Sequence, residues 1–568
     1  CGKCAVISDT DGDSIFSEVS RLTVATCGSD GSIWTSEGRP DEFRSIICDP
    51  SAEKFGYDLK FQRNTLCNSG IEMKGKFMDI ELMHYLINPE KSHKIEILAK
   101  SYLDVNIDDM LPQKEEQPSL SLFDEVPEDS AAASRQAEAA VTLMLGEKIY
   151  EELTELEISG LYDTMEEPLL KVLAKMEREG VRLDVAQLRK YAAALTAEMN
   201  EIQERVREMA GEPELNIMSP KQIGIVLFEK LKLDSKVKPK SGVRYSYPTD
   251  EETLSALADR HPIVNEILEY RGVKKLLSTY IEPFPNYISN VDGKIHTTFN
   301  QALTATGRLS SSKPNLQNIP VRTDLGAEIR KVFIPKEGHV LVDADYSQIE
   351  LRVLAHIADD PVMQDAFVRN IDVHTATAAQ VFGVAFDEVT PLQRRHAKAV
   401  NFGIVYGISE FSLAEDIGVS RYEAKEYIEN YLTNYAGVRK YMKDIVISAR
   451  ESGYTETMFG RRRYIPELTS SNFNIRSGAE RIALNTPIQG TAADLIKLAM
   501  IRVEQALNEN FPEAQLLLQV HDELIVECPE EIATEVAALV SREMQEIAAL
   551  KVPLTAEAKW GKSWYDAK

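Results

Sequence analysis

The stretch VLVDADYSQIELRVLAHIA, residues 340–358, is typical of a buried β-strand that passes directly into a helix. Its first five residues, VLVDA, form a short apolar run, which indicates a strand covered by protein on both faces. Asp345 follows at the end of this strand, and the segment IELRVLAHIA has the apolar spacing of a helix. The sequence therefore predicts a carboxylate held at the edge of a sheet.

A second acidic position lies in residues 516–528, where the runs LLLQV and LIVEC flank the short turn HDE. This pattern predicts a β-hairpin with Asp522 and Glu523 at its tip. Two strand-end carboxylates brought together could bridge two Mg²⁺ ions about 4 Å apart, as in enzymes of phosphoryl transfer. An isolated HDE turn is more often simply solvated, so this interpretation depends on a third segment.

That third segment is RRHAKAVNFGIVYG, residues 394–407, in which Arg394, Lys398, Phe402 and Tyr406 recur every four residues. A helix places such residues along one stripe of its surface. Cations suit the phosphates of a nucleoside triphosphate, and aromatic rings suit its base and sugar. An ordinary amphipathic helix is the alternative, but it does not explain why cations and rings share one stripe.

Length and composition permit a nucleic-acid partner without establishing one. The 568 residues exceed a single domain, and the net charge is −26, from 64 basic and 90 acidic residues. Phosphate binding depends on the local field and not on the total charge. Residues 219–246 carry seven basic side chains against two acidic ones, whereas residues 104–130 carry nine acidic side chains and one lysine.

The cysteine content and the hydrophobic pattern indicate a protein with reduced cysteines and no membrane-spanning segment. No run of 18 apolar residues occurs, and no signal peptide is recognised. Six cysteines form no disulfide framework, and the lone pair Cys1 and Cys4 favours free thiols over zinc. We therefore expect a cytoplasmic protein. Because the chain begins with Cys1 instead of Met, we also expect it to be a fragment.

Along the chain, the first 100 residues indicate a mixed α/β region, with RLTVATC and SIWTSE forming a hairpin across GSDG. Residues 104–135 are predicted to form a flexible acidic loop, and residues 137–210 to be helical. Gly180 and Gly211 stand where helices would end. Residues 346–510 are again mostly helical in pattern.

The segments DYSQIELR (345–352), RRHAKAVNFGIVYG (394–407) and QVHDEL (519–524) resemble motifs A, B and C of the family A DNA polymerases, in the same order. TATGRLSSSKPNLQNIP (304–320) and ERIALNTPIQGTAAD (480–494) also resemble that family. The likeness runs from about residue 155 to the terminal WYDAK. It implies template-directed DNA synthesis at a primer 3′ end, in DNA replication and repair.

The resemblance implies an α+β multidomain fold, a right-hand polymerase preceded by an RNase H-like α/β domain of the 3′–5′ exonuclease type. The exonuclease-like domain is expected at residues 1–150, with the acidic loop at 104–135, and the polymerase domain at 151–568. The subdivisions expected are a thumb at about 160–285, a palm at about 286–350 and 476–568, and fingers at about 351–475.

The resemblance also implies the chemistry of the site. Asp345 and Asp522 would bind two Mg²⁺ ions, for which Mn²⁺ could substitute, with help from the carbonyl of Tyr346 and support from Glu523. Lys398 would donate a proton to pyrophosphate. Further nucleotide contacts are expected from Gln348, Glu350, His374, Arg394, Phe402 and Tyr406, with Glu350 closing the space of a ribose 2′-hydroxyl.

Contacts with primer–template DNA are implied for six further residues. These are Arg308, Arg481, Asn485, Gln489, His521 and, at the tip of the thumb, Lys221. Minor-groove acceptors are nearly alike in all correct base pairs, so such contacts can test pairing without reading sequence. The substrates would be deoxynucleoside triphosphates, and the chain is expected to act as a monomer with no membrane partner.

The exonuclease-like region resembles its family with defects. Asp9 and Asp11 occupy the first motif, but Gln62 stands at the ligand position of the second and Ala140 at that of the third. A neutral amide and a methyl group cannot replace two carboxylates, so we expect no proofreading. Asp58 or Glu138 could substitute if the motifs are shifted.

The acidic loop contains QPSLSLF, which resembles the peptide that docks bacterial proteins on the sliding clamp. Gln117, Leu120, Leu122 and Phe123 would fill the clamp pocket, although the loop could equally pack two apolar side chains on its own domain. No 5′-nuclease region is recognised, so we expect displacement of a downstream strand. The alternatives are a single-subunit RNA polymerase and a non-catalytic DNA-binding scaffold.

Overall fold

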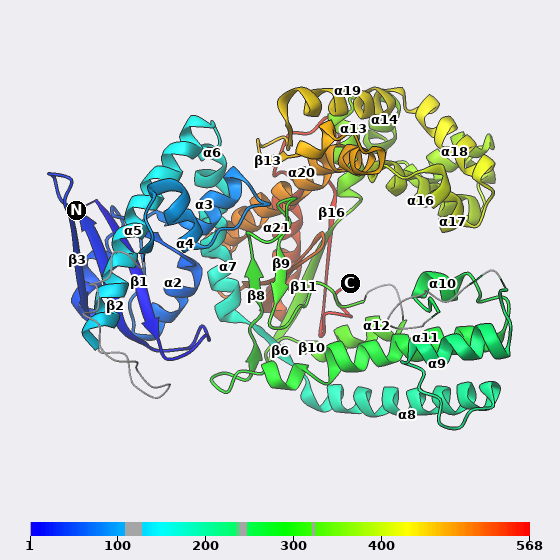
Figure 1. The fold of residues 1–568 in the computed structure, drawn as a ribbon, viewed down its shortest axis with the longest axis horizontal. Helices are drawn as coiled ribbons and strands as arrows, with labels where there is room; N and C mark the ends of the chain where they lie inside the picture. The colour runs from blue at the N-terminus through cyan, green and yellow to red at the C-terminus, as the bar shows by residue number, and fades with distance from the viewer. Residues whose placement is uncertain (1, 108–127, 236, 238–246, 321–323) are drawn as a thin grey trace. The chain divides into compact units, whose positions relative to one another are not determined.

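The computed structural model describes residues 2–107, 128–235, 237, 247–320 and 324–568 (Figure 1). The chain forms two compact units. The first contains Cys1–Glu179, Thr298–Ser312 and Val342–Lys559, and the second contains Gly180–Thr297, Lys313–Leu341 and Trp560–Lys568. Within the described ranges, no helix is both long and apolar enough to cross a membrane.

The N-terminal part of the first unit is a mixed β-sheet with strand order β3-β2-β1-β4-β5 (Figure 1). Strands β1 (Lys3–Thr10), β2 (Val19–Cys27) and β3 (Ile33–Gly38) are antiparallel neighbours. Strand β4 (Glu53–Gly56) pairs in parallel with β1 and with β5 (Phe77–Asp79). The pairing of β2 with β3 confirms the predicted hairpin.

This sheet is contacted by the helices α2 (Leu59–Asn68), α3 (Ile80–Ile87) and α5 (Glu128–Glu155). Helix α5 packs against β1, β2 and β3, and Leu22, Phe55, Phe77 and Leu143 are fully buried in the shared core. Residues 108–127 lie outside the described part of the chain. The predicted loop at 104–135 is wrong for its last eight residues, because α5 already begins at Glu128.

A second sheet of the first unit has the strand order β14-β15-β11-β16. Its strands are β14 (Gln515–Val520), β15 (Glu523–Pro529), β11 (His339–Tyr346) and β16 (Ala556–Gly561). The predicted hairpin is confirmed, because Val520 of β14 pairs antiparallel with Glu523 of β15. Helix α20 (Phe473–Asn510) packs against β14, and helix α21 (Ala533–Gln545) packs against β15 and α20.

Between β11 and β14 the chain is mostly helical, as the sequence predicts for residues 346–510, apart from the short strands β12 (Tyr454–Glu456) and β13 (Arg462–Tyr464). The helices are α13 (Ile349–Ile357), α14 (Pro361–Val368), α15 (Val373–Phe382), α16 (Pro391–Val405), α17 (Glu410–Ile417), α18 (Arg421–Asn434) and α19 (Ala436–Ser452). Helix α16 packs against α13, α15, α17, α18 and α20. It begins at a capping box in which Thr390 and Gln393 bond to each other's backbone N–H groups.

The second unit contains the long helices α8 (Val185–Ala210) and α11 (Pro262–Leu276), which pack against each other (Figure 1). A small sheet with the order β10-β6-β7 joins Phe333–Ile334, Val181–Leu183 and Lys294–Ile295. The C-terminal Trp564 is fully buried, with the Arg330 guanidinium 4.1 Å from its ring centre. Gly180 and Gly211 follow α7 (Glu167–Glu179) and α8, as predicted.

Candidate active site

Two aspartates meet at one edge of the second sheet. Asp345 is the last residue but one of β11, and Asp522 lies in the turn between β14 and β15, the strand next to β11. The backbone N–H of Tyr346 donates to the carbonyl oxygen of Asp522 at 3.1 Å. Both carboxylates are half-buried, whereas Glu523 is buried at the start of β15. The structure thus brings the two strand ends together.

A buried hydrogen bond of Tyr346 holds this edge of the sheet in place. Its side chain is buried, and its hydroxyl donates to the carbonyl oxygen of Met544 in α21 at 2.6 Å. Burial, together with the negative charge of Asp522, raises the pKa of the Tyr346 hydroxyl well above its usual value. This hydroxyl therefore stays protonated and donates, which fixes the backbone beside Asp345.

Glu350 is the centre of a polar cluster in the first turn of α13. Its buried carboxylate accepts a hydrogen bond from the Tyr406 hydroxyl at 2.9 Å and another from the guanidinium of Arg308. Burial and Glu350 raise the pKa of Tyr406, and the Gln489 side chain also bonds to this hydroxyl. Three separate sequence segments therefore meet at this carboxylate.

The four residues of the predicted stripe, on α16 and at its end, differ in exposure, and one of them already has a charged partner. Arg394 and Lys398 are exposed, Phe402 is half-buried and Tyr406 is 40% exposed. Arg394 forms an ion pair with Asp372 at 2.7 Å, a partner that the sequence did not indicate. Since Asp372 also caps the N-terminus of α15, this pair links the two helices.

His374 is a buried residue of α15. It is 3% exposed, its Nδ1 accepts from the amide of Asn401 at 3.0 Å, and burial lowers its pKa to about 4. Asn401 in turn accepts from the hydroxyl of Thr377. Sequence reasoning missed Asn401, although a polar residue inside the apolar run AVNFG signals a buried group that needs partners.

The expected DNA-contacting residues of α20 lie four residues apart, at Arg481, Asn485 and Gln489, so they share one helix face. Gly407, at φ +66°, leaves room for Arg481, whose Cγ would lie 2.9 Å from a Cβ at that position. His521 is exposed in the turn before Asp522. Lys221 is exposed in helix α9 (Pro220–Gly224) of the second unit.

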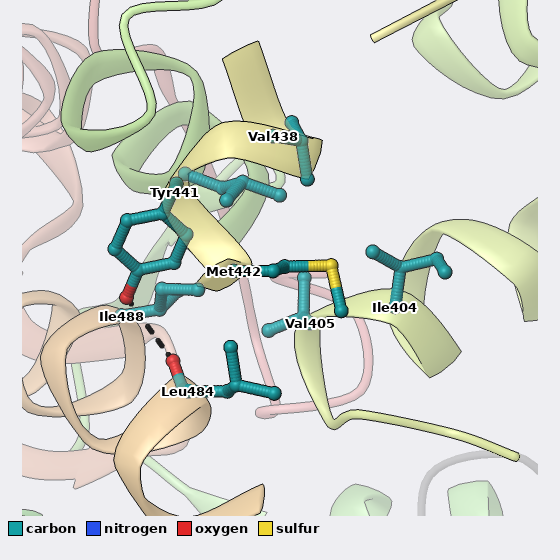
Figure 2. Close-up of a pocket in the computed structure, with 8 residues that line it drawn as sticks. Ile404, Val405, Val438, Tyr441, Met442, Leu484 and Ile488 are labelled. Atoms are coloured by element: carbon teal, nitrogen blue, oxygen red, sulfur yellow. Dashed lines mark hydrogen bonds between the residues drawn. The ribbon is translucent and has the colours of Figure 1, made fainter. Parts of the chain in front are cut away.

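A small apolar pocket lies where α13, α16, α19 and α20 meet (Figure 2). Val405, Met442 and Ile488 are among its lining residues, and the Tyr441 hydroxyl closes one side by donating to the carbonyl of Leu484 at 3.2 Å. The polar cluster begins one residue beyond Val405 and Ile488, at Tyr406 and Gln489. The apolar contacts therefore fix the backbones that present these two polar side chains.

Residues 185–566 match the family described as DNA polymerase family A. The chain belongs to DNA polymerase family A. It is 46% identical over 531 residues to DNA polymerase I of Bacillus subtilis (strain 168) and 45% identical over 532 residues to that of Geobacillus stearothermophilus. Each match covers 93% of the chain but only 59% and 60% of the relative, so the chain spans about three fifths of these proteins.

A solved structure agrees with this assignment. The POL domain of Pol1 from M. smegmatis, in complex with DNA primer-template and dNTP, is 35% identical and superposes with a TM-score of 0.88. The match covers 99% of this chain and 95% of that one. The predicted family and its α+β polymerase fold are thereby confirmed.

The aspartate pair fits the metal requirement of the family, whose members depend on divalent metal ions. Asp345 and Asp522 offer carboxylate oxygens, the donor type that hard cations such as Mg²⁺ prefer. The described ranges contain no cluster of three or more His, Cys, Asp or Glu side chains arranged for a metal. Two carboxylates completed by phosphate and water are nevertheless a common way to hold Mg²⁺.

The two aspartates of the first exonuclease-like motif are each bonded to another protein group. Asp9 lies 3.6 Å from the guanidinium of Arg135, which also pairs with Glu37 at 2.7 Å. Asp11 accepts the backbone N–H of Glu18 at 3.0 Å. Asp9 is thus paired with a protein cation.

The other positions of this region are also engaged elsewhere. The buried Gln62 donates to the Tyr57 carbonyl at 2.9 Å, and Asp58 caps α2 through the N–H of Phe61. Ala140 contributes only a methyl group to α5. Burial and the like charge of Glu96 raise the pKa of Glu138.

Asp79 should make the N-terminal part less stable as the pH rises. It is fully buried and accepts the N–H groups of Leu59 (2.8 Å) and Leu82 (3.1 Å). Burial and Glu81 raise its pKa to about 7 from 3.8. Because the folded pKa is the higher one, this group's contribution to stability is complete below about pH 4 and is lost as the pH rises through about 7.

We therefore expect Asp79→Asn to flatten this pH dependence. The amide loses one acceptor oxygen at every pH, but it never becomes charged. Calorimetric melting temperatures should show the parent losing stability relative to the variant between about pH 4 and pH 8. Asp41→Asn, at an exposed carboxyl in the same part, is the matched control. Parallel curves for Asp79→Asn and the parent would refute the assignment.

Proposed function

We propose that the chain catalyses template-directed addition of deoxynucleotides to a primer 3′ end, with release of pyrophosphate, in DNA replication and repair. The observation that supports this most is the meeting of three motif segments at Glu350, beside the paired strand ends of Asp345 and Asp522. The neighbouring M. smegmatis structure, a complex with primer-template and dNTP, supports the same substrates.

In this proposal, Asp345 and Asp522 hold two Mg²⁺ ions, for which Mn²⁺ can substitute, with the Tyr346 carbonyl as a further ligand and Glu523 in support. Bound ions of this kind lower the pKa of the primer 3′-hydroxyl and neutralise the triphosphate and pyrophosphate. Lys398, exposed on α16, donates a proton to the departing pyrophosphate.

We assign the remaining nucleotide contacts to residues on α13, α15 and α16 or at the ends of these helices. Arg394 binds phosphate by exchanging Asp372 for the ligand, and Gln348 contributes from the N-terminus of α13. His374 acts as a neutral group, since its pKa of about 4 keeps it uncharged near pH 7. Phe402 and Tyr406 stack on the nucleotide.

We propose that Glu350 and Tyr406 select the sugar, while five residues bind the primer terminus and the minor groove. Tyr406 and Arg308 fix the Glu350 carboxylate in place, where it would exclude a 2′-hydroxyl. The DNA-contacting residues are Arg308, Arg481, Asn485, Gln489 and His521, with Lys221 gripping the duplex.

An extension assay with matched sets of nucleotides tests this function against its alternatives. We expect a labelled DNA primer on a DNA template to be extended with deoxynucleotides and not with ribonucleotides. Preferential use of ribonucleotides would favour a single-subunit RNA polymerase. Binding of the primer–template without extension by either set would favour a non-catalytic scaffold.

We propose further that the exonuclease-like region does not proofread. The pairing of Asp9 with Arg135, and the neutral Gln62 and Ala140, leave too few carboxylates for two metal ions. A 3′-mismatched primer incubated with Mg²⁺ and no nucleotides should keep its length. Mg²⁺-dependent shortening by the parent that disappears in Asp9→Ala would show an active site and refute the proposal.

The sliding clamp remains a proposed partner. Gln117, Leu120, Leu122 and Phe123 lie outside the described residues, so the proposal rests on the peptide QPSLSLF alone. Immobilised bacterial clamp should capture the parent, and the double variant Leu122→Ala/Phe123→Ala should bind at least about tenfold more weakly, as expected for loss of two buried anchors. Equal capture of parent and variant would remove this partner.

A further inference from the structure

Arg308 reaches Glu350 from a short hairpin that belongs to the first unit. Strands β8 (Thr298–Asn300) and β9 (Ser310–Ser312) pair antiparallel, and the connecting turn carries Arg308. Within the turn, the Thr304 hydroxyl donates to the carbonyl of Arg308 at 2.7 Å. A two-stranded hairpin of this length is not stable alone, so its position depends on what holds it.

A tyrosine of the N-terminal part holds the turn. Tyr85 of α3 is 1% exposed, and its hydroxyl donates to the carbonyl of Thr304 at 2.7 Å. Since Thr304 bonds in turn to the backbone of Arg308, a continuous path of two hydrogen bonds runs from α3 to Arg308. Burial raises the pKa of Tyr85 to about 12, so its hydroxyl remains a donor at any ordinary pH.

A buried ion pair holds strand β8. Lys60 of α2 donates to the carbonyl of Phe299 and lies 2.6 Å from the carboxylate of Glu177 in α7. Glu177 accepts the N–H of the same Phe299 at 2.7 Å. Both backbone groups of Phe299 are thus bound by charged side chains that are almost fully buried, which makes these bonds strong.

A cluster of four buried charged side chains also lies next to the hairpin. Glu166 accepts from Arg461 and from Lys497 (2.7 Å), and Arg461 also pairs with Asp494 at 2.7 Å. The two positive and two negative charges balance. Although burial opposes ionisation, Lys497 and Arg461 lower the pKa of Glu166 to about 2.

This cluster contacts the hairpin at two points. The amide of Gln301 donates to the Glu166 carboxylate at 2.8 Å. Arg461 lies directly under Gly307, where a Cβ would be 2.6 Å from its Nε. Gly307 directly precedes Arg308. The guanidinium of Arg461 therefore packs against the part of the turn that carries Arg308.

We propose that the N-terminal part, although unable to proofread, positions the hairpin 298–312 and thereby sets Arg308 against Glu350, with Tyr85 and Lys60 as positioning residues. The inference rests on the proposed function, because Arg308 and Glu350 are taken to contact substrate. It assigns to the exonuclease-like region a role in polymerisation that its own degenerate motifs do not suggest.

Hydrogen–deuterium exchange tests directly whether the N-terminal part holds the hairpin in place, and it needs no enzymatic activity. We expect Tyr85→Phe to raise the exchange rates of hairpin amides within 298–312 by about fivefold, the effect of losing one ordinary hydrogen bond. The double variant Lys60→Met/Glu177→Gln should raise them further without leaving a buried charge unpaired. Tyr57→Phe, whose hydroxyl instead meets Glu81 at 3.4 Å, is the matched control and should leave the hairpin unchanged.

A double-mutant cycle then tests the link to Arg308. If Tyr85 acts through Arg308, Tyr85→Phe should lower the efficiency of deoxynucleotide insertion by about fivefold in the parent and by much less in Arg308→Ala. Equal losses in both backgrounds, or unaltered exchange of the hairpin in Tyr85→Phe, would overturn the inference. A parent that extends no primer would instead contradict the proposed function, and the exchange result would still show whether the hairpin is held.

Discussion

Replacing Asp522 with alanine is expected to lower the rate of primer extension by about 10³-fold or more. The variant keeps one carboxylate of the pair and loses the other, which in the proposal would help to hold both divalent ions. The fold should survive, because the bond between the Tyr346 N–H and Asp522 uses the backbone carbonyl. Single-turnover extension of a labelled primer measures the loss, and the melting temperature should change little.

The matched control for this loss is Glu513→Ala. Glu513 is an exposed carboxylate before β14, so its removal changes the net charge equally but leaves the strand ends intact. It should extend primers at the rate of the parent. Activity in Asp522→Ala within about tenfold of the parent would mean that this carboxylate is no metal ligand.

Glu350→Ala is expected to weaken the exclusion of ribonucleotides by about 10²-fold. The parent holds this buried carboxylate between Tyr406 and Arg308, so a 2′-hydroxyl beside it would meet a filled space. Alanine removes this obstacle. The ratio of insertion efficiencies for a deoxynucleotide and its ribonucleotide, measured under single-turnover conditions, reports the change directly.

Glu350→Gln separates volume from charge in this test. The amide has nearly the same size and can still accept from Tyr406, so exclusion by volume should persist. If the alanine variant discriminates as well as the parent does, Glu350 is not the residue that senses the sugar. If alanine and glutamine variants lose discrimination equally, the charge matters more than the volume.

The parts of the site that the sequence predicted are those encoded by short local patterns. The strand before Asp345, the hairpin around Asp522 and the helix of Lys398 each follow from the spacing of apolar residues within one segment. The family resemblance then indicated which segments belong to one site. The convergence on Glu350 is what the structure adds, since it joins residues far apart in the chain.

The parts that could not be predicted depend on partners distant in sequence. Nothing near Glu166 indicates that its charge is balanced by Arg461, because the two lie 295 residues apart. Likewise, no local pattern places the Tyr85 hydroxyl on the carbonyl of Thr304. The loop expected at 104–135 was wrong at its end for a different reason. Its alanine-rich residues favour a helix as strongly as their acidic neighbours favour a loop.

Insertion opposite each of the four template bases, in turn, tests the central claim most directly. A labelled primer–template that presents one template base is mixed with the parent chain, Mg²⁺ and a single deoxynucleoside triphosphate. We predict that the primer gains one nucleotide rapidly only when the base is complementary, and that a chelator abolishes the reaction. Absence of insertion with every combination, or insertion that ignores the template base, would contradict the claim that this chain is a template-directed DNA polymerase.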